Sequence, residues 1–521
     1  MNQSFSTEKF DPQEIIDLQK AAERIIQAIK SQQKIVVMGD YDVDGISSTA
    51  IFLNFLKMLK ISAEYVIPSR TSGYGLSIES IKKYPEHLII AVDCGSSALQ
   101  ELSYAVENKI DIVVIDHHHM DSIPTACAIV NPHRPDEKDD YKMLCAAGLA
   151  FLCCVTINQL LKKSNFYAEN QISEPNMMNF LDIVALATVA DVVPLRGLNR
   201  VFVIEGLKLI RKRQNIGIDA LVALYKSGKI TSESIGYFFG PRLNAAGRLE
   251  TADQGLKLLT TQNPIEAKKI ADHLEVLNKE RQRLEHKMFE EACQSADFSQ
   301  NFICVAKENW HLGVIGIAAG RLREKFNRPS IVISIDPAGG ICKASCRSTD
   351  QVDISVLIKK AIEKNIIACG GGHALAAGFS IEKEKIPELE KFLRDEISQE
   401  PLAFESYADC IVDLSDLNLH FMSTIAKLQP FGMGNRPPKF VIHNIRIASH
   451  KIVGEKHISL MLEDTTSNKK QKAISFRSVD TPLGEILMTR QDPILALGSL
   501  SVSEWNGNMY VDFQLDDVAE S

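Results

Sequence analysis

Short apolar runs alternate with helical patterns along residues 21–130. Three continuous apolar runs, at 35–38, 88–92 and 112–115, are typical of strands buried on both faces of a sheet. Apolar residues recur at helical spacing between 46 and 59, directly after the first run. The alternation predicts βαβ units, and therefore a parallel sheet covered by helices.

Beyond the polar loop that ends at Asp140, apolar helices dominate as far as Ala190. A long amphipathic helix is expected from Pro264, because an apolar stripe runs along it while Lys, Glu and Arg occupy its other faces. The runs at 302–305 and 330–333 then predict strands of a second α/β unit. The long helix would link or brace the two units.

The pattern becomes all-β after Pro437. Asn506-Gly507, between Trp505 and Tyr510, is a strong signal for a hairpin turn. The candidate strands are 440–448, 457–463, 472–476, 494–500 and 508–515. Five strands in so short a tail predict a small barrel, of which the oligonucleotide-binding barrel is the commonest candidate.

A chain of 521 residues is too long for one ordinary core, so several domains are expected. The pattern places an α/β catalytic domain with an N-terminal extension and a helical segment at 1–262, and a connecting helix at 263–294. A second, smaller α/β domain follows at 295–400, and a linker with the β-barrel occupies 401–521.

Composition narrows the class of protein. The net charge of −8 argues against a basic body that binds nucleic acid over its whole surface, although a basic groove is compatible with it. The eleven cysteines form no Cys-x-x-Cys pair, which favours reduced thiols over disulfides or a thiolate zinc site. The first twenty residues resemble no signal peptide, and no apolar stretch reaches membrane-spanning length. We therefore expect a soluble, cytoplasmic protein with no membrane partner.

Acidic clusters follow all three apolar runs, at 40–45, 93–95 and 116–118. The carboxyl ends of parallel strands form the ligand crevice of an open sheet, so these side chains should gather there. Carboxylates gathered in this way repel one another unless a cation neutralises them. The expected ligands are Asp42, Asp44, Asp93, His117 and, from the helical segment, Asp191.

Mainly oxygen ligands with one imidazole favour Mn²⁺ or Mg²⁺ over Zn²⁺. Two such ions, with Asp93 between them, would suit an in-line displacement at a phosphate. His118 is better placed to contact the scissile phosphate than the metals. Each cluster alone is weak, because Asp-His-His is more often a surface turn and Asp-x-Asp-Gly can be part of a calcium loop; here no glutamate closes such a loop. The three clusters and Asp191, found in this order along the chain, carry the metal hypothesis.

The segments 39–45, 93–95, 116–118 and 190–194 resemble the four motifs of the DHH phosphoesterase superfamily, and 240–248 and 370–374 look like its connector and DHH-associated domain. Many relatives carry a histidine where this chain has Met38, so Asp40 is a tentative additional ligand. The resemblance is to the branch that degrades single-stranded DNA from the 5′ end. It implies release of 5′-mononucleotides, catalytic roles for Asp93, Asp116 and His118, and a function in DNA repair and recombination. A single-strand-binding protein and a helicase would be partners.

The same resemblance implies which residues hold the strand. Arg70, Ser345 and Arg347 would bind the terminal 5′-phosphate, which the enzyme would prefer. Two further groups have two interpretations each. Glycines before a helix would present backbone N–H groups to an anion, with His373 as a further donor, or the glycines would only permit close packing. The connector residues would contact a backbone phosphate or form a buried interdomain ion pair. These candidate phosphate contacts are Gly371, Gly372 and His373 in one group, and Arg242, Asn244 and Arg248 in the other.

Two other classes of function compete with this one. Another phosphoesterase of the superfamily, acting on short RNA, cyclic dinucleotides or pyrophosphate, would share the metal motifs but would need neither the long helix nor the β tail. A replication scaffold that has lost catalysis would show eroded carboxylates, whereas all of them are present here.

Overall fold

The computed structural model describes residues 14–69, 75–120, 122–138, 141–226, 228–337, 340–397, 406–467, 469–490, 492–505 and 507–520. The chain divides into two units, Met1–Leu402 and Ala403–Ser521. Each is described by itself.

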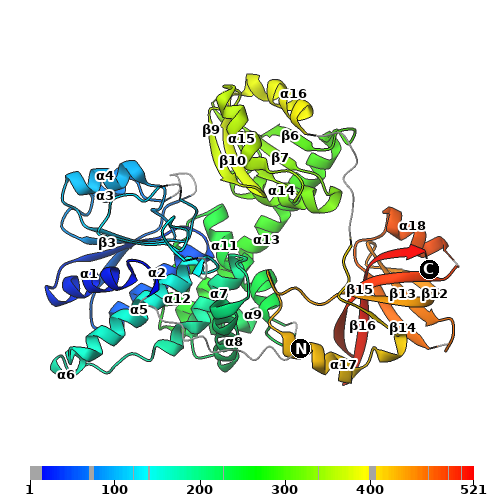
Figure 1. Cartoon of the computed structure of the whole chain (residues 1–521), viewed down its shortest axis with the longest axis horizontal. Helices are drawn as coiled ribbons and strands as arrows, with labels where there is room; N and C mark the ends of the chain where they lie inside the picture. The colour runs from blue at the N-terminus through cyan, green and yellow to red at the C-terminus, as the bar shows by residue number, and fades with distance from the viewer. Residues whose placement is uncertain are drawn as a thin grey trace. The chain divides into compact units, whose positions relative to one another are not determined.

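The first unit begins with a parallel five-stranded sheet (Figure 1). Its order is β2 (Ala63–Val66), β1 (Ile35–Met38), β3 (Leu88–Val92), β4 (Ile112–Ile115) and β5 (Ala128–Val130). Successive residues of the strands belong to two different cores, as the alternation of a pleated strand requires. Val37 and Ile90 face one core and Val36 and Ile89 the other. This explains why the runs are apolar at every position.

Helices cover both faces of this sheet (Figure 1). The first core contains residues of α1 (Leu18–Lys30), α2 (Val43–Met58) and α5 (Ala146–Lys163). The second contains residues of α3 (Ile78–Lys82) and α4 (Leu99–Glu107). The predicted parallel α/β sheet is therefore confirmed.

A helical segment extends the first core. It comprises α6 (Phe166–Glu169), a 3₁₀ turn (Met177–Phe180), α7 (Leu181–Ala190), α8 (Gly197–Lys212), α9 (Ile216–Leu224), α10 (Ser232–Ser234), a π-helical turn (Ile235–Phe239), α11 (Gly240–Leu249) and α12 (Asp253–Thr260). α7 and α8 pack closely at Gly206, where a Cβ atom would lie 2.2 Å from the carbonyl oxygen of Leu181. Glycine at this position lets the two helices approach.

The predicted long helix is α13 (Pro264–Ser295). Asn263 accepts hydrogen bonds from the first backbone N–H groups of the helix, and Pro264 occupies the first turn, where its missing N–H is no loss. The first half of α13 joins the first core through Ile270 and Leu274, and the second half joins another core through Met288. α13 therefore connects two cores.

The second α/β sheet has the order β6 (Ile303–Glu308), β7 (Ser330–Ile335), β8 (Cys342–Arg347), β10 (Ala376–Ile381) and β9 (Cys369–His373). One face packs against α14 (Leu312–Phe326), and the other against α15 (Ile354–Glu363) and α16 (Ile386–Glu396). The expectation that glycines 370–372 precede a helix is wrong, because they form the edge strand β9. A Cβ at Gly370 would lie 2.6 Å from Phe379 Cβ, so pairing with β10 requires glycine there.

The second unit is a barrel. Its strands are β12 (Phe440–Val453), β13 (His457–Asp464), β14 (Lys470–Ser475), β16 (Asn508–Glu520) and β15 (Ile494–Trp505), and the pairing of β12 with β15 closes it. β11 (Cys410–Val412), α17 (Leu419–Ile425) and α18 (Pro482–Thr489) accompany the barrel. The predicted barrel is confirmed, although β12, β15 and β16 extend further than expected. Residues of β12 beyond Ala448 are exposed, so no apolar alternation marks them in the sequence. Asn506 of the predicted turn lies outside the described residues.

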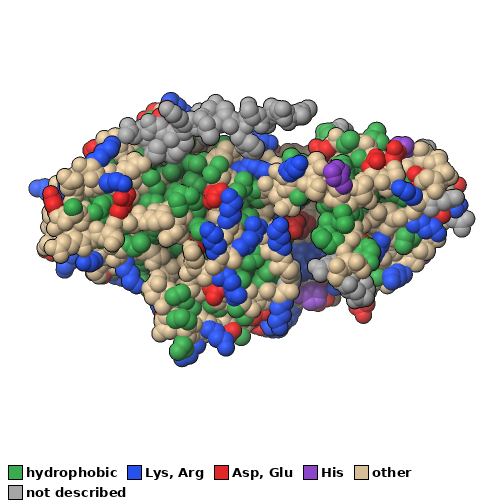
Figure 2. Space-filling view, turned by 90° about the horizontal axis from the view of Figure 1, so that it is seen from below, with side chains coloured by type: hydrophobic (Ala, Val, Ile, Leu, Met, Phe, Trp, Pro, Cys, Tyr) green, Lys and Arg blue, Asp and Glu red, His purple; other side chains and the backbone are tan. Residues whose placement is uncertain are grey.

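Charge is mixed over the surface. Figure 2 shows one face, on which Lys and Arg side chains are interspersed with acidic and hydrophobic ones. In the part of the chain that the structure describes, no helix has the length and apolar character needed to cross a membrane.

Candidate active site

The loop after β1 and the first turn of α2 bring three aspartates to the carboxyl end of the sheet. Asp42 caps α2 by accepting hydrogen bonds from the N–H groups of Asp44 (2.9 Å) and Gly45 (3.1 Å) on its Oδ1. A Cβ on Gly45 would lie 2.5 Å from the carbonyl oxygen of Asp40, so glycine allows the helix to start beside the loop. Asp40 is 3% exposed and lies with Asp42 and Asp93, within 4.8 Å between candidate ligand atoms. Asp40 is thus placed where a ligand is needed.

Asp44 has a second structural task. Its carboxylate oxygens accept hydrogen bonds from Ala146 N–H (2.7 Å) and Ala147 N–H (2.8 Å), at the start of α5. Cys145, at the N-cap of that helix, makes no side-chain cap, and Asp44 supplies it instead. Asp44 therefore joins α5 to the site.

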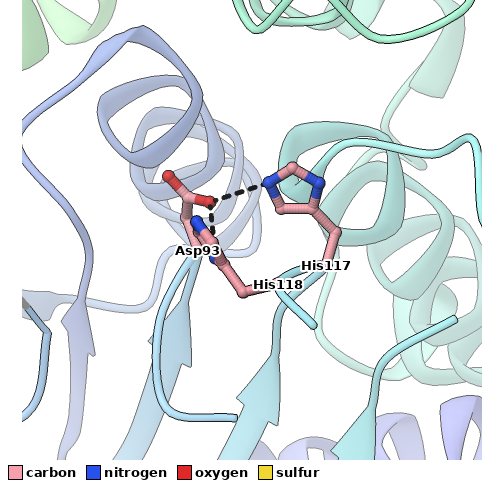
Figure 3. A group of neighbouring side chains, drawn as sticks. All are labelled: Asp93, His117 and His118. Atoms are coloured by element: carbon pink, nitrogen blue, oxygen red, sulfur yellow. Dashed lines mark ion pairs between the residues drawn. The ribbon is translucent and has the colours of Figure 1, made fainter. Parts of the chain in front are cut away.

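Asp93 lies at the centre of the cluster, at the end of β3. Its carboxylate Oδ1 is 3.4 Å from His117 Nε2 and 3.8 Å from His118 Nδ1 (Figure 3). The backbone at Asp93 has φ of 58°, a left-handed conformation that aspartate tolerates better than most residues. Burial, followed by the charges of Asp44, Asp42 and other carboxylates, raises the pKa of Asp93 well above its ordinary value.

His117 and His118 differ in their surroundings. His117 Nε2 lies 3.6 Å from both Asp44 Oδ2 and Asp191 Oδ2. His118 is more exposed, at 35% against 14%, and its Nδ1 is 2.7 Å from Asp116 Oδ1. Because a carboxylate only accepts, Nδ1 donates to Asp116 and Nε2 remains for another partner. His117 thus faces the carboxylates, while His118 is held by Asp116.

Asp116 is buried behind His118 and is a ligand in none of the three groups suited to a metal. Its Oδ1 accepts hydrogen bonds from the N–H groups of His117 and His118, and its Oδ2 accepts from Ser96 N–H. Burial opposes ionisation of Asp116, but the His118 hydrogen bond, the charges of His118 and His117 and the Ser96 hydrogen bond together outweigh it and keep the pKa below its usual range. Burial opposes protonation of His118, but the hydrogen bond and charge of Asp116, with the charges of Asp42 and Asp44, together raise its pKa to about 8.

Sequence reasoning missed the side chains that support this pair. Asn131 Nδ2 donates to the carbonyl oxygen of His118 (2.8 Å) and to Ser96 Oγ (2.6 Å). Asn131 directly follows β5, so its place after an apolar run was the available signal.

Asp191 is the C-cap of α7. A negative charge is unfavourable at a helix C-terminus, where the helix dipole presents its negative end. Asp191 Oδ2 is buried and accepts no hydrogen bond from the described residues. Burial and the charges of Asp44 and Asp42 raise the pKa of Asp191 well above its ordinary value. This carboxylate is therefore unfavourable where it stands unless a cation binds.

Three overlapping groups of candidate ligands result. They are Asp93, His117 and His118; Asp44, His117 and Asp191; and Asp40, Asp42 and Asp93. Oxygen donors dominate, which fits Mn²⁺ or Mg²⁺. A buried Asp191 oxygen that accepts no hydrogen bond from the described residues, together with the raised pKa values, is what a metal-free cation site produces. Met38, by contrast, is buried in the core of α3 and α4.

Two of the predicted phosphate-binding residues, Ser345 and Arg347, belong to the sheet of the second α/β domain. Ser345 and Arg347 lie on strand β8, two residues apart and on one face, close to Gly316 of α14. Arg347 Nη1 donates to the carbonyl oxygen of Cys346 (2.7 Å). Arg70 lies outside the described residues.

His373 is exposed at the end of β9. Its pKa is lowered by burial and then by the positive charges of His118, His119 and His117. Gly371 has open space around its Cβ position, so packing does not demand glycine there, whereas Gly372 has φ of 151° and a tight approach to β10.

The connector residues have different surroundings. Asn244 Oδ1 accepts from Val43 N–H (3.1 Å) and so braces the start of α2. Arg248 Nη1 donates to the carbonyl oxygen of Gly313 (3.0 Å). Arg242 forms an ion pair with Glu275 at 2.7 Å, the arrangement that the structural alternative describes.

A cavity of about 140 Å³ lies beside these residues. It is lined by Ala190, Gly236, Gly240, Pro241, Asn244, Arg248, Arg281 and Ile317. Arg281, which sequence reasoning missed, is buried and paired with Glu285 (2.6 Å). The cavity adjoins the C-terminal end of α7, next to Asp191.

The N-terminal domain of the DHH family matches residues 34–188, the DHHA1 domain matches 299–399, and the RecJ OB domain matches 408–517. The chain is 32% identical to the single-stranded-DNA-specific exonuclease RecJ of Escherichia coli, over 97% of this chain and 91% of that protein. The chain belongs to the RecJ family. The predicted superfamily, and the architecture of two α/β domains and an oligonucleotide-binding barrel, are confirmed.

Other RecJ relatives agree. Bacillus subtilis RecJ is 32% identical over 98% of this chain, which spans 64% of that longer protein. The crystal structure of Thermus thermophilus RecJ in complex with Mn²⁺ superposes with a TM-score of 0.82 at 26% identity, covering 97% of this chain and 72% of that one. A second structure of the same protein contains Mg²⁺, with a TM-score of 0.75 at 25% identity.

Proposed function

We propose that this protein is a metal-dependent exonuclease that hydrolyses single-stranded DNA from the 5′ end and releases 5′-mononucleotides. Near full-length likeness to RecJ exonucleases and the matching OB domain support this function over that of a phosphoesterase for small substrates. The observation that carries the proposal is the overlap of the ligand groups: Asp93 and His117 each belong to two of them.

Two ions of Mn²⁺ or Mg²⁺ fit that overlap. The residues that would hold them are Asp40, Asp42, Asp44, Asp93, His117 and Asp191. When bound, the ions supply Lewis-acid activation of water and neutralise charge at the phosphate. Relatives with Mn²⁺ and with Mg²⁺ support this choice of cofactor.

His118 would contact the scissile phosphate. Asp116 occupies Nδ1, so Nε2 can donate a hydrogen bond to a phosphate oxygen. In the metal-free protein burial lowers the pKa of His118, but the hydrogen bond and charge of Asp116 together with the charges of Asp42 and Asp44 raise it to about 8, which favours the protonated ring that a phosphate would attract. Asp116 is a positioning residue that keeps this ring oriented and charged.

The strand would be held by the second α/β domain and the connector. Arg70, Ser345 and Arg347 would bind the terminal 5′-phosphate, which accounts for a preference for phosphorylated ends. Gly371, Gly372 and His373 would contact the next phosphates. Arg248 and Asn244 would contact the backbone at the cavity beside Asp191. Arg242 would contribute chiefly through its pair with Glu275.

Single-stranded DNA labelled separately at each end tests the proposal. With Mn²⁺, the 5′ label should appear at once as mononucleotide, while duplex DNA, short RNA and pyrophosphate remain intact. Asp93→Ala should abolish hydrolysis and leave strand binding, whereas Asp272→Asn on the exposed face of α13 should change neither. Near-normal turnover by Asp93→Ala would refute the two-ion assignment, and cleavage only of short RNA would refute the substrate.

The cellular role belongs to the same proposal. Removal of nucleotides from single strands suits DNA repair and recombination, in which a helicase would supply the strand and a single-strand-binding protein would hold it. The cytoplasmic location predicted from the sequence remains a prediction.

A further inference from the structure

A second cavity lies at the ends of α2 and α7 that point away from the metal cluster. Its volume is about 370 Å³, within the range of small-molecule pockets. It is lined by Asn54, Lys57, Met58, Asn179, Phe180, Asp182, Ile183, Leu209, Gln214, Asn215 and Gln262. None of these residues has a part in the function proposed above.

Asp182 is the unusual group in this cavity. It is 3% exposed, and within the described chain its hydrogen-bond donors are backbone N–H groups, that of Ile183 at 2.7 Å and its own. No described side chain donates to it. Burial raises its pKa to about 7. A buried carboxyl without a side-chain partner is costly, and a ligand with N–H donors would offset that cost.

The rest of the lining defines what such a ligand must look like. Phe180, Ile183 and Leu209 provide apolar walls. Lys57 is exposed at the rim and forms no ion pair with a described residue. A buried carboxyl, apolar walls and an exposed cation in the lining suit a flat heterocycle that bears N–H donors and is joined to a phosphate. Guanine has two adjacent N–H donors on one edge, which a carboxylate can accept together.

The cavity is separate from the metal cluster. α7 carries Asp182 in its first turn and Asp191 at its C-cap, nine positions later, which corresponds to roughly 14 Å along a helix. α2 runs in the opposite sense, with Asp44 in its first turn and Lys57 in its last. A ligand in the cavity would therefore contact neither the candidate metal ligands nor the connector.

We propose that this cavity is a binding site for a guanine mononucleotide, with the base on Asp182 and the phosphate near Lys57. Mononucleotides are also the products of the reaction proposed above, but the site and its test do not depend on that reaction.

Calorimetry with dGMP on the full chain in EDTA tests the site, because the chelator keeps the metal cluster empty. One dGMP should bind per chain, and dTMP and inorganic phosphate should bind more weakly. Asp182→Asn should weaken dGMP binding about tenfold, since an amide cannot accept both donors. Lys57→Ala should weaken dGMP but not guanosine, which lacks the phosphate. Lys60→Ala, on an exposed residue just past α2 and outside the cavity, is the matched control.

Circular dichroism and thermal unfolding would verify that Asp182→Asn is folded, and the exposed Lys57→Ala provides a variant with no buried change. Equal dGMP affinity in the wild type and both variants would overturn the proposal, as would the absence of saturable binding. Loss of dGMP binding in Asp93→Asn would also overturn it, because the nucleotide would then occupy the metal cluster.

Discussion

Asp93→Asn should stabilise the metal-free protein while it destroys the metal site. The substitution removes one negative charge from the centre of the carboxylate cluster and preserves the shape of the side chain. It adds no backbone strain, because asparagine also tolerates the φ of 58° at this position. The stability gain therefore measures the electrostatic cost of the empty site.

The size of the gain follows from the geometry. Candidate ligand atoms of Asp40, Asp42 and Asp93 lie within 4.8 Å of one another. Two unit charges at that separation repel by about 3.5 kcal/mol at an effective dielectric constant of about 20. Protonation of Asp93, whose pKa is raised by burial and by the neighbouring carboxylates, limits this repulsion. We expect Asp93→Asn to raise the unfolding free energy in EDTA at pH 8 by about 2 kcal/mol or more.

The sign of the pH dependence follows from the pKa. Asp93 has a pKa raised well above its ordinary value of 3.8 in the folded protein. The loss of unfolding free energy caused by ionised Asp93 is absent below the pKa that Asp93 has in the unfolded chain. It grows as pH rises, by at most about 1.4 kcal/mol per pH unit, and is complete above the pKa that Asp93 has in the folded protein. Asparagine has no such penalty. The advantage of the variant should accordingly be smaller at pH 5.5 than at pH 8.

Urea unfolding followed by circular dichroism provides the measurement, with Asp272→Asn as an exposed control of the same chemistry. Addition of Mn²⁺ should make the wild type more stable than Asp93→Asn. A ligand at a hundred times its dissociation constant stabilises by about 2.7 kcal/mol, and the wild type should gain far more than the variant. If Asp93→Asn is less stable than the wild type in EDTA at pH 8, the cluster is not an electrostatically strained cation site.

Three further results are expected. Asp116→Asn should lower the pKa of His118 from about 8 toward its usual 6.5, read from imidazole resonances of the metal-free protein; an unchanged value would show that Asp116 does not control the ring. Arg347→Ala should slow digestion of 5′-phosphorylated strands about tenfold with little effect on unphosphorylated ones, and equal losses would make it a general backbone contact. Gly206→Ala should lower the unfolding free energy by about 1–3 kcal/mol in urea, because its Cβ would meet a carbonyl oxygen at 2.2 Å. Gly236→Ala, with 3.7 Å to its nearest neighbour, should be neutral, and equal stability of the two variants would contradict the packing argument.

The sheet and the acidic cluster could be predicted because their signals are local. An uninterrupted apolar run marks a strand covered on both faces, and a carboxylate after each run marks the end where ligands gather. Asp42, Asp93 and His117 come together for this reason. The rule that the carboxyl ends of parallel strands lie at the same edge of a sheet is enough to predict that these side chains lie close together.

Other features depend on contacts that a single segment does not reveal. Glycines 370–372 look like a loop before a helix, yet they pair as an edge strand because β10 is available beside them. The task of Asp44 as a cap for α5 involves residues about a hundred positions away, and the support of His118 by Asn131 crosses two strand ends. Arginine commonly binds phosphate, but Arg242 forms an ion pair with Glu275 of α13. Tertiary pairing, rather than propensity, determined each of these outcomes.

Several features that destabilise the fold locally lie in the candidate metal cluster, and their shared location needs an explanation. Asp93 adopts a left-handed backbone conformation, and Val192, next to Asp191, has φ of 60°, which is costly for a β-branched residue. Asp191 stands at the negative end of a helix dipole, and its carboxylate is buried together with those of Asp44 and Asp93. A fold stabilised only by packing would gain from replacing any of these groups. These features lie together at the carboxyl end of the sheet, which is explained if a divalent cation compensates for all of them at once. Whether Mn²⁺ makes the wild type more stable than Asp93→Asn tests that explanation without any assay of activity.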